Sequence, residues 1–131
     1  GKVNLSFGNA FFSGILCNIL VCSAVLMAVA AKDITGKILA IFFPIMAFVI
    51  SGFEHCIANM YYIPSGIFAS MNSNYVQAAS ESYGITEEMI TALHWKNFVF
   101  ANLVPVTLGN IVGGSVLIGG ICYYLYLKSG D

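Results

Sequence analysis

One stretch of the sequence decides the fold: Phe48-Val-Ile-Ser-Gly-Phe-Glu-His-Cys-Ile-Ala-Asn-Met-Tyr-Tyr-Ile-Pro64. It places Glu54, His55 and Asn59 in the middle of an apolar run, Ile38 to Met71, that contains no other charge. Glu and His side chains in lipid-like surroundings are costly, and they persist mainly where they face a protein interior or a water path. The function of the chain therefore depends on what these polar residues do.

The composition is that of a membrane protein. Hydrophobic residues make up 59% of the 131 residues and charged residues 8%, whereas soluble proteins have about 25% charged residues. The sequence has no arginine and a formal net charge of −1, which argues against a nucleic-acid partner. The four cysteines lie inside apolar runs, and their spacing favours small buried side chains over a redox or zinc motif.

Three apolar segments are long enough to cross a bilayer, which takes about 20 apolar residues in a helix. They predict one transmembrane unit that contacts membrane lipid. The expected parts are spans at about 8–31, 38–64 and 98–127, with an extracellular polar segment at 70–96.

The middle span has two interpretations, a single tilted helix or a helix broken near Ser51-Gly52. We prefer the broken helix, because unwound backbone at membrane depth is tolerated where it lines a cavity. A break would also direct the positive end of a half-helix dipole to the midplane. If residues 53–63 are helical, His55 and Asn59 share a face, because they are four residues apart.

Smaller signals concern packing and orientation. Gly109 and Gly113 form a small-xxx-small pattern, which predicts close approach of a neighbouring helix. Thr86, followed by two glutamates, predicts the N-cap of a short helix in the polar segment.

The short turn with Lys32 and Lys37 predicts that this turn lies on the cytoplasmic side of the membrane. Three crossings would place the C-terminus on that side too.

Each expected span carries polar side chains at mid-membrane depth: Asn18, then Glu54, His55 and Asn59, then Asn110. They could be interhelical hydrogen-bonding groups or the lining of a permeation path. Phe48, just before the break, could be a packing residue or a hydrophobic gate. The sequence contains no HExxH, GxSxG or phosphate-loop motif, so we expect neither an enzyme nor a metal or cofactor.

Three motifs resemble the formate/nitrite transporter family, which includes formate, nitrite and hydrosulfide channels. They are Gly14-Ile-Leu-Cys-Asn-Ile-Leu-Val-Cys22, Gly52-Phe-Glu-His-Cys-Ile-Ala-Asn-Met60 and Asn102-Leu-Val-Pro-Val-Thr-Leu-Gly-Asn-Ile-Val-Gly-Gly114. The resemblance implies an all-α membrane protein with an aquaporin-like inverted-repeat fold. The chain would be its second three-helix repeat, with a broken middle helix. It further implies homopentamers, with one pore per protomer, in the bacterial inner membrane.

The resemblance also implies roles for individual residues. His55 looks like the family's central pore histidine, which meets the permeating anion. Phe48 falls at an aromatic constriction, and Lys2 falls where a basic residue biases the vestibule toward anions. The other matches are Asn18 and Asn110, which look like paired asparagines near the histidine, and Glu54 and Asn59, which match the motif that supports it.

The family's first repeat has no counterpart here. We expect a fragment that lacks the N-terminal half of the same protein, because the sequence starts with Gly1 just before a span. The alternatives are a half-pore that pairs with a partner chain and a structural membrane subunit. The expected function is selective passive passage of a small monovalent anion. Formate, nitrite and hydrosulfide stay open, as does proton-coupled transport.

Overall fold

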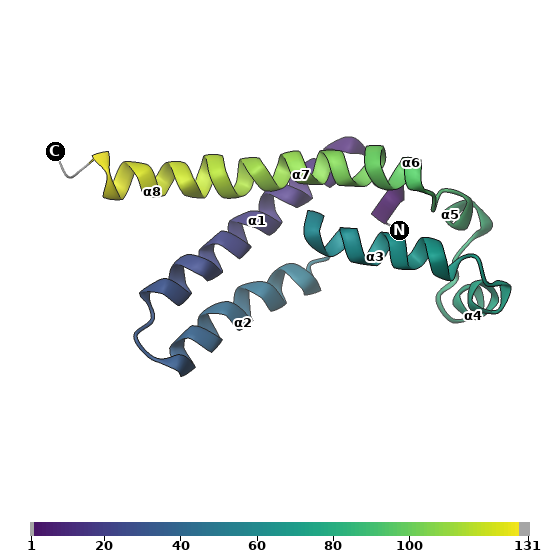
Figure 1. The fold of residues 1–131 in the computed structure, drawn as a ribbon, viewed down its shortest axis with the longest axis horizontal. Coiled ribbons are helices and arrows are strands. Elements are labelled where there is room, and N and C mark those ends of the chain that lie inside the picture. Colours follow the sequence, from purple (N-terminus) through teal and green to yellow (C-terminus); the bar gives the residue numbers. More distant parts are fainter. Residues whose placement is uncertain (1, 129–131) are drawn as a thin grey trace.

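The computed structural model describes residues 2–128, and this range is helical without strands. A long helix lies along one side, a helical hairpin crosses it, and smaller helices close the other end (Figure 1). The long helix comprises α6 (Trp95–Asn97), η2 (Phe98–Leu103), α7 (Val104–Ile111), η3 (Val112–Ile118) and α8 (Gly119–Tyr126). The other elements are η1 (Lys2–Asn4), α1 (Phe7–Ala30), α2 (Ile34–Ile50), α3 (Cys56–Ala69), α4 (Ser73–Tyr83) and α5 (Glu87–Thr91).

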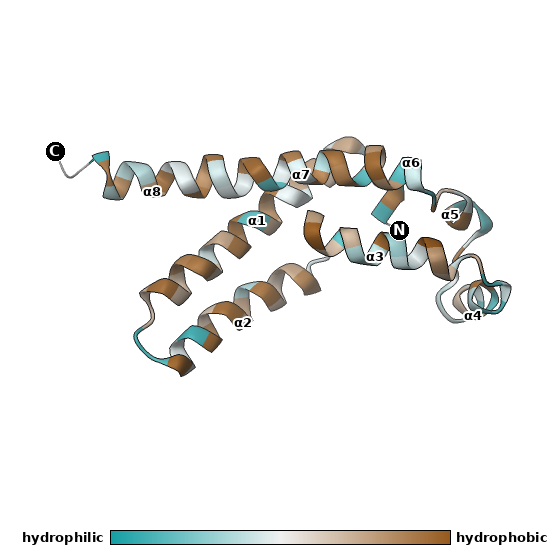
Figure 2. Cartoon of the chain, in the orientation of Figure 1, coloured by the Kyte–Doolittle hydropathy of each residue, from teal (hydrophilic) through white to brown (hydrophobic). Residues whose placement is uncertain are grey.

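The hairpin consists of α1 and α2, each started by a side-chain cap. Ser6 Oγ accepts the N–H of Asn9 at 3.3 Å, and Asp33 Oδ1 accepts the N–H of Gly36 at 2.8 Å. Capping satisfies backbone donors that a helix N-terminus leaves unpaired. Apolar residues cover α1, α2 and much of the long helix, while polar residues gather in α4, around α5 and in the α1–α2 turn (Figure 2). Both α1 and the long helix are long and apolar enough to cross a bilayer.

The middle helix is broken. Helix α2 ends at Ile50 and α3 begins at Cys56. Between them, Gly52 has a φ of +67°, a left-handed conformation that glycine adopts without steric cost. The second half starts three residues later than Phe53 and continues past Pro64 to Ala69, because a proline inside an apolar helix does not always end it.

The long helix contains two π-helical segments, η2 and η3. At the end of η2, the N–H of Val104 bonds to the carbonyl of Val99, five residues back. The next residue is Pro105, which has no N–H and whose ring crowds the preceding turn. A wider turn before the proline relieves that crowding, so the side chains of η2 take a different register from those of a uniform α-helix.

Glycines let α1 cross the long helix with the two backbones in contact. A Cβ at Gly109 would run into the carbonyl oxygen of Phe11, and one at Gly113 into the carbonyl oxygen of Ile15. Helix α1 offers a glycine of its own, since a Cβ at Gly14 would come within 2.8 Å of a backbone carbonyl oxygen. The small-xxx-small prediction is confirmed, and this crossing places the residues of the site.

The polar segment is more ordered than a loop. The Thr86 cap is confirmed, because its Oγ1 accepts the N–H of Met89 at 3.4 Å. Helix α4 was not expected; it ends at Gly84, which has a φ of +62°. A small apolar core holds this end of the molecule together, and it consists of Val3, Ile63, Ile67 and Phe98.

Candidate functional site

Glu54 lies in the break of the middle helix, and its side chain is buried at 2% exposure. Its Oε1 accepts a hydrogen bond from Lys2 Nζ at 2.8 Å. Its Oε2 accepts from the Nδ2 atoms of Asn59 and Asn102, at 2.6 and 3.0 Å. A buried carboxylate needs such partners, because burying an unpaired charge costs several kcal/mol or more. Both carboxylate oxygens of Glu54 therefore accept hydrogen bonds from protein groups.

Two buried amides complete this group. Asn59 Nδ2 also donates to Asn102 Oδ1 at 2.8 Å, and Asn102 Nδ2 donates to the backbone oxygen of Lys2 at 2.9 Å. Both asparagines have 0% exposure. Lys2, Glu54, Asn59 and Asn102 are called the carboxylate network below. Within residues 2–128, Asn59 Oδ1 is a buried acceptor without a hydrogen-bond partner.

Asn110 holds the backbone at the break. Its Oδ1 accepts the N–H of Cys56 at 2.9 Å, and its Nδ2 donates to the carbonyls of Gly14 at 2.8 Å and Glu54 at 3.1 Å. Asn18 Nδ2 in turn donates to the backbone oxygen of Asn110 at 2.7 Å. Since lipid offers no hydrogen-bond partners, unwound backbone at membrane depth requires substitutes of this kind. The two asparagines serve as interhelical hydrogen-bonding groups.

His55 differs from these residues because only one nitrogen of its ring makes a hydrogen bond within the described residues. It is the N-cap of α3, and its Nδ1 accepts the N–H of Ala58 at 3.3 Å. The ring stacks on Phe48, with centroids 5.9 Å apart and planes inclined by 30°. An accepting Nδ1 leaves the proton of the neutral imidazole on Nε2. That Nε2–H makes no hydrogen bond within the described residues, and the side chain is half-buried.

The expectation that His55 and Asn59 share a helix face depended on a helix over residues 53–63, but α3 begins only at Cys56, with His55 as its N-cap. His55 therefore precedes the helix, and Asn59 turns to Glu54 instead. Lys2, expected to attract anions, is paired with Glu54.

Asn102 is the residue that sequence reasoning missed, although it opens the third family-like motif. Its signal was the same as that of Asn110, an amide within a charge-free apolar run. Such an amide requires partners at membrane depth, and here it finds all of them in the carboxylate network.

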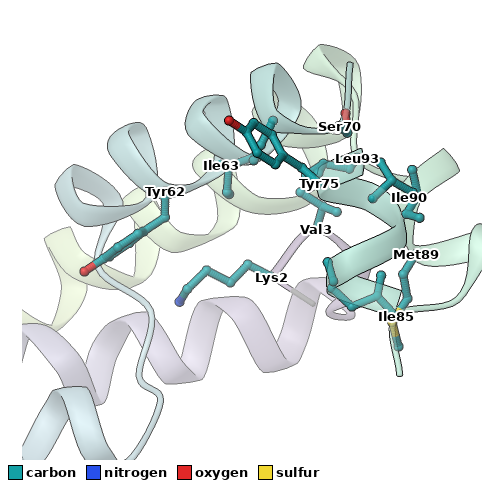
Figure 3. A pocket seen from close by; sticks show the side chains of 14 residues that line it. Lys2, Val3, Tyr62, Ile63, Ser70, Tyr75, Ile85, Met89, Ile90 and Leu93 are labelled. Carbon is teal, nitrogen blue, oxygen red and sulfur yellow. The ribbon is translucent and has the colours of Figure 1, made fainter. Parts of the chain in front are cut away.

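An apolar cavity of about 440 Å³ lies beside this site, between α3, α4 and α5. Figure 3 shows Tyr62, Tyr75, Met89 and Leu93 around it, and the Lys2 ammonium points away from the α5 side. That ammonium is bound to Glu54. The cavity therefore presents mainly apolar surface and suits an apolar contact rather than an anion.

The family model for the formate/nitrite transporter matches residues 1–124. The chain belongs to the formate/nitrite transporter family. It is 45% identical over 130 residues to a probable formate transporter of Methanothermobacter thermautotrophicus, covering 98% of this chain and 40% of the relative. It is 44% identical to the formate channel FocA of Haemophilus influenzae, covering 95% of this chain and 43% of the relative. The chain thus spans less than half the length of these relatives.

A solved structure shows the same fold. A pentameric formate channel with formate bound matches at a TM-score of 0.81 and 42% sequence identity, over 97% of this chain and 49% of that channel. The fold is accordingly that of an all-α channel protein, and the chain is a membrane protein. The relatives are named channels and transporters, which agrees with the expectation that the chain is not an enzyme.

Proposed function

We propose that this chain is the second repeat of a selective, passive channel for a small monovalent anion of the formate class. One observation carries the proposal: within residues 2–128, the Nε2–H of His55 makes no hydrogen bond. Glu54, Asn102 and Asn110 donate to or accept from other protein groups. His55 instead stands at the break, beside the ring of Phe48, with its Nε2–H unengaged.

This arrangement suits an anion that sheds water as it passes. The Phe48 ring packs against His55 and would form one side of a narrow apolar passage, which excludes larger hydrated ions. The Nε2–H then offers a hydrogen bond that offsets part of the dehydration cost. Passing a proton to a weak-acid anion would require the imidazolium form of His55, in which Nδ1 no longer accepts the N–H of Ala58.

The carboxylate network removes an electrostatic obstacle. Glu54 directly precedes His55 in the chain, and an unpaired carboxylate there would repel an anion. Lys2 Nζ, 2.8 Å from Glu54 Oε1, balances that charge. The N-terminus of α3 adds a positive dipole end at the break. Lys2 thus biases the path toward anions by neutralising Glu54.

The assembly follows from what the chain leaves uncovered. Large apolar side chains on α1 and α2 are more than half exposed, among them Val29 at 78% and Ile50 at 77%. Lipid, a first repeat and neighbouring protomers are the surfaces that such residues face in a membrane channel. We propose a homopentamer in the bacterial inner membrane. Each protomer would contain a first repeat, and its C-terminus would be cytoplasmic, on the same side of the membrane as the lysine-bearing turn.

The test is anion flux into liposomes that contain the full-length protein, measured from pH 5 to 8 with formate, nitrite and hydrosulfide. His55→Phe is expected to abolish formate flux or to remove its pH dependence. His94→Phe is the matched control, because His94 also caps a helix through Nδ1, at 3.4 Å from the N–H of Asn97. Unchanged flux at every pH in His55→Phe would refute the role of His55. A wild-type protein that assembles but carries no anion would favour a structural subunit.

A further inference from the structure

We propose that Asn102 is a positioning residue that holds the Glu54 carboxylate and thereby sets the charge balance beside the anion path. The inference rests on the proposed channel function, and it specifies what Asn102 does within the carboxylate network. Asn102 would not touch the anion, because it is fully buried. It would act through Glu54, which adjoins His55 in the chain.

The side chain of Asn102 meets the other three members of the carboxylate network. Its Nδ2 donates to Glu54 Oε2 at 3.0 Å and to the backbone oxygen of Lys2 at 2.9 Å. Its Oδ1 accepts from Asn59 Nδ2 at 2.8 Å. One amide therefore connects η1, the break and α3 to the long helix. A carboxamide donates on one side and accepts on the other, whereas an ionised aspartate accepts alone and a leucine does neither.

The surrounding backbone fixes where this amide points. Asn102 lies in the π-helical segment η2, just ahead of Pro105. Phe98, at the start of the same segment, is packed in the small apolar core with Val3 and Ile63. With both the helix register and the packing set, Asn102 has little freedom to turn away. It is a rigid support against which the longer Glu54 and Lys2 side chains are oriented.

The consequence for the anion path is electrostatic. Without the Asn102 amide, Glu54 Oε2 keeps only the donor from Asn59, and the backbone oxygen of Lys2 loses its side-chain donor. The Lys2–Glu54 pair then loses a fixed position relative to His55. A second carboxyl group at position 102 would go further, since it would compete with Glu54 for Lys2, and two carboxyl groups this close share a proton rather than both ionise.

The experiment replaces the Asn102 amide by a carboxylate in the full-length protein, alone and together with the reverse replacement at Glu54. Formate flux is then measured in liposomes. In Asn102→Asp we expect the half-saturating formate concentration to rise, up to about the tenfold limit that one full extra charge roughly 10 Å from the anion would give at an effective dielectric of about 20. In the double variant Glu54→Gln/Asn102→Asp the network again holds one carboxylate. We expect its half-saturating concentration to return to within about threefold of wild type. A packing role alone would make the two substitutions additive.

Asn97→Asp is the matched control. Asn97 lies on the same helix and also donates a side-chain hydrogen bond, to the carbonyl of Ala92 at 3.0 Å, but it is outside the carboxylate network. Its substitution is expected to leave the half-saturating concentration unchanged. The pentamer content of every variant is measured by size-exclusion chromatography. If Asn102→Asp alone fails to assemble, recovery of assembly in the double variant supports the coupling, and no recovery overturns it.

The outcomes separate the two proposals. If wild-type flux requires His55 but Asn102→Asp has a normal half-saturating formate concentration, the proposed role of Asn102 is refuted. The proposed channel function is then unaffected. Absence of formate flux in the wild type overturns both. A double variant that is no better than Asn102→Asp also overturns the positioning role.

Discussion

Gly109→Ala tests whether the α1 crossing holds the site together. The added Cβ would run into the carbonyl oxygen of Phe11 and would lie 3.1 Å from the backbone nitrogen of Ile15. Both are backbone atoms, so no side chain can rotate out of the way. The two helices would have to separate, although alanine by itself favours a helix more than glycine does.

The cost can be worked from the contacts at the crossing. Overpacking a close-packed interface costs about 1–3 kcal/mol. Separation also lengthens two hydrogen bonds across the crossing, from Asn18 to the Asn110 backbone oxygen at 2.7 Å and from Asn110 to the Gly14 carbonyl at 2.8 Å, each worth about 1 kcal/mol. The higher helix propensity of alanine offsets about 1 kcal/mol of this loss of stability. The net expected loss is therefore about 2–4 kcal/mol.

Gly120→Ala is the control, because Gly120 lies on the same helix and a Cβ there meets nothing within 4 Å. It is expected to be neutral or to stabilise the protein by up to about 1 kcal/mol. The assay is equilibrium unfolding of the full-length protein in detergent, followed by circular dichroism. Equal unfolding midpoints for the two variants would show that the crossing tolerates a Cβ and that the close approach of α1 is not required.

Two further substitutions test local parts of the structure. Asn110→Ala should destabilise the protein by about 3 kcal/mol, because it leaves the N–H of Cys56 and the carbonyl of Gly14 without side-chain partners; a loss below 1 kcal/mol in the same unfolding assay would contradict this. Thr86→Ala should cost only about 0.5–1 kcal/mol and leave flux intact, since it removes a long 3.4 Å cap at an exposed helix start. Reduced flux with normal unfolding would argue against a purely local role for Thr86.

The sequence predicted the fold class from local chemistry. Long charge-free runs predict membrane helices, because lipid penalises charge regardless of tertiary context. The Gly109–Gly113 spacing and the Thr86 cap were also readable, since each depends on only a few neighbouring residues. Helix α4 escaped prediction because its residues are mostly polar, although its caps are local signals: Asn72 accepts the N–H of Asn74 at the start, and Gly84 follows the last residue.

The polar residues around His55 show where sequence reasoning ended. Sequence alone placed Glu54, His55 and Asn59 at a break, and their family-like motif indicated a pore. Helical spacing could not fix the start of α3, because whether it starts at residue 53 or 56 depends on contacts from α1 and α7. Only the tertiary structure turned Asn59 to Glu54 and left His55 against Phe48.

The sequence by itself determined that this chain crosses a membrane as helices and that costly polar groups lie at the break of the middle one. The tertiary structure decided which of those groups pair with each other. Lys2 and Glu54 are 52 residues apart in sequence, and Asn102 is 100 residues from Lys2. The physical reason is that burial leaves no water for these groups, so each takes whatever partner the helix crossings bring within hydrogen-bonding distance.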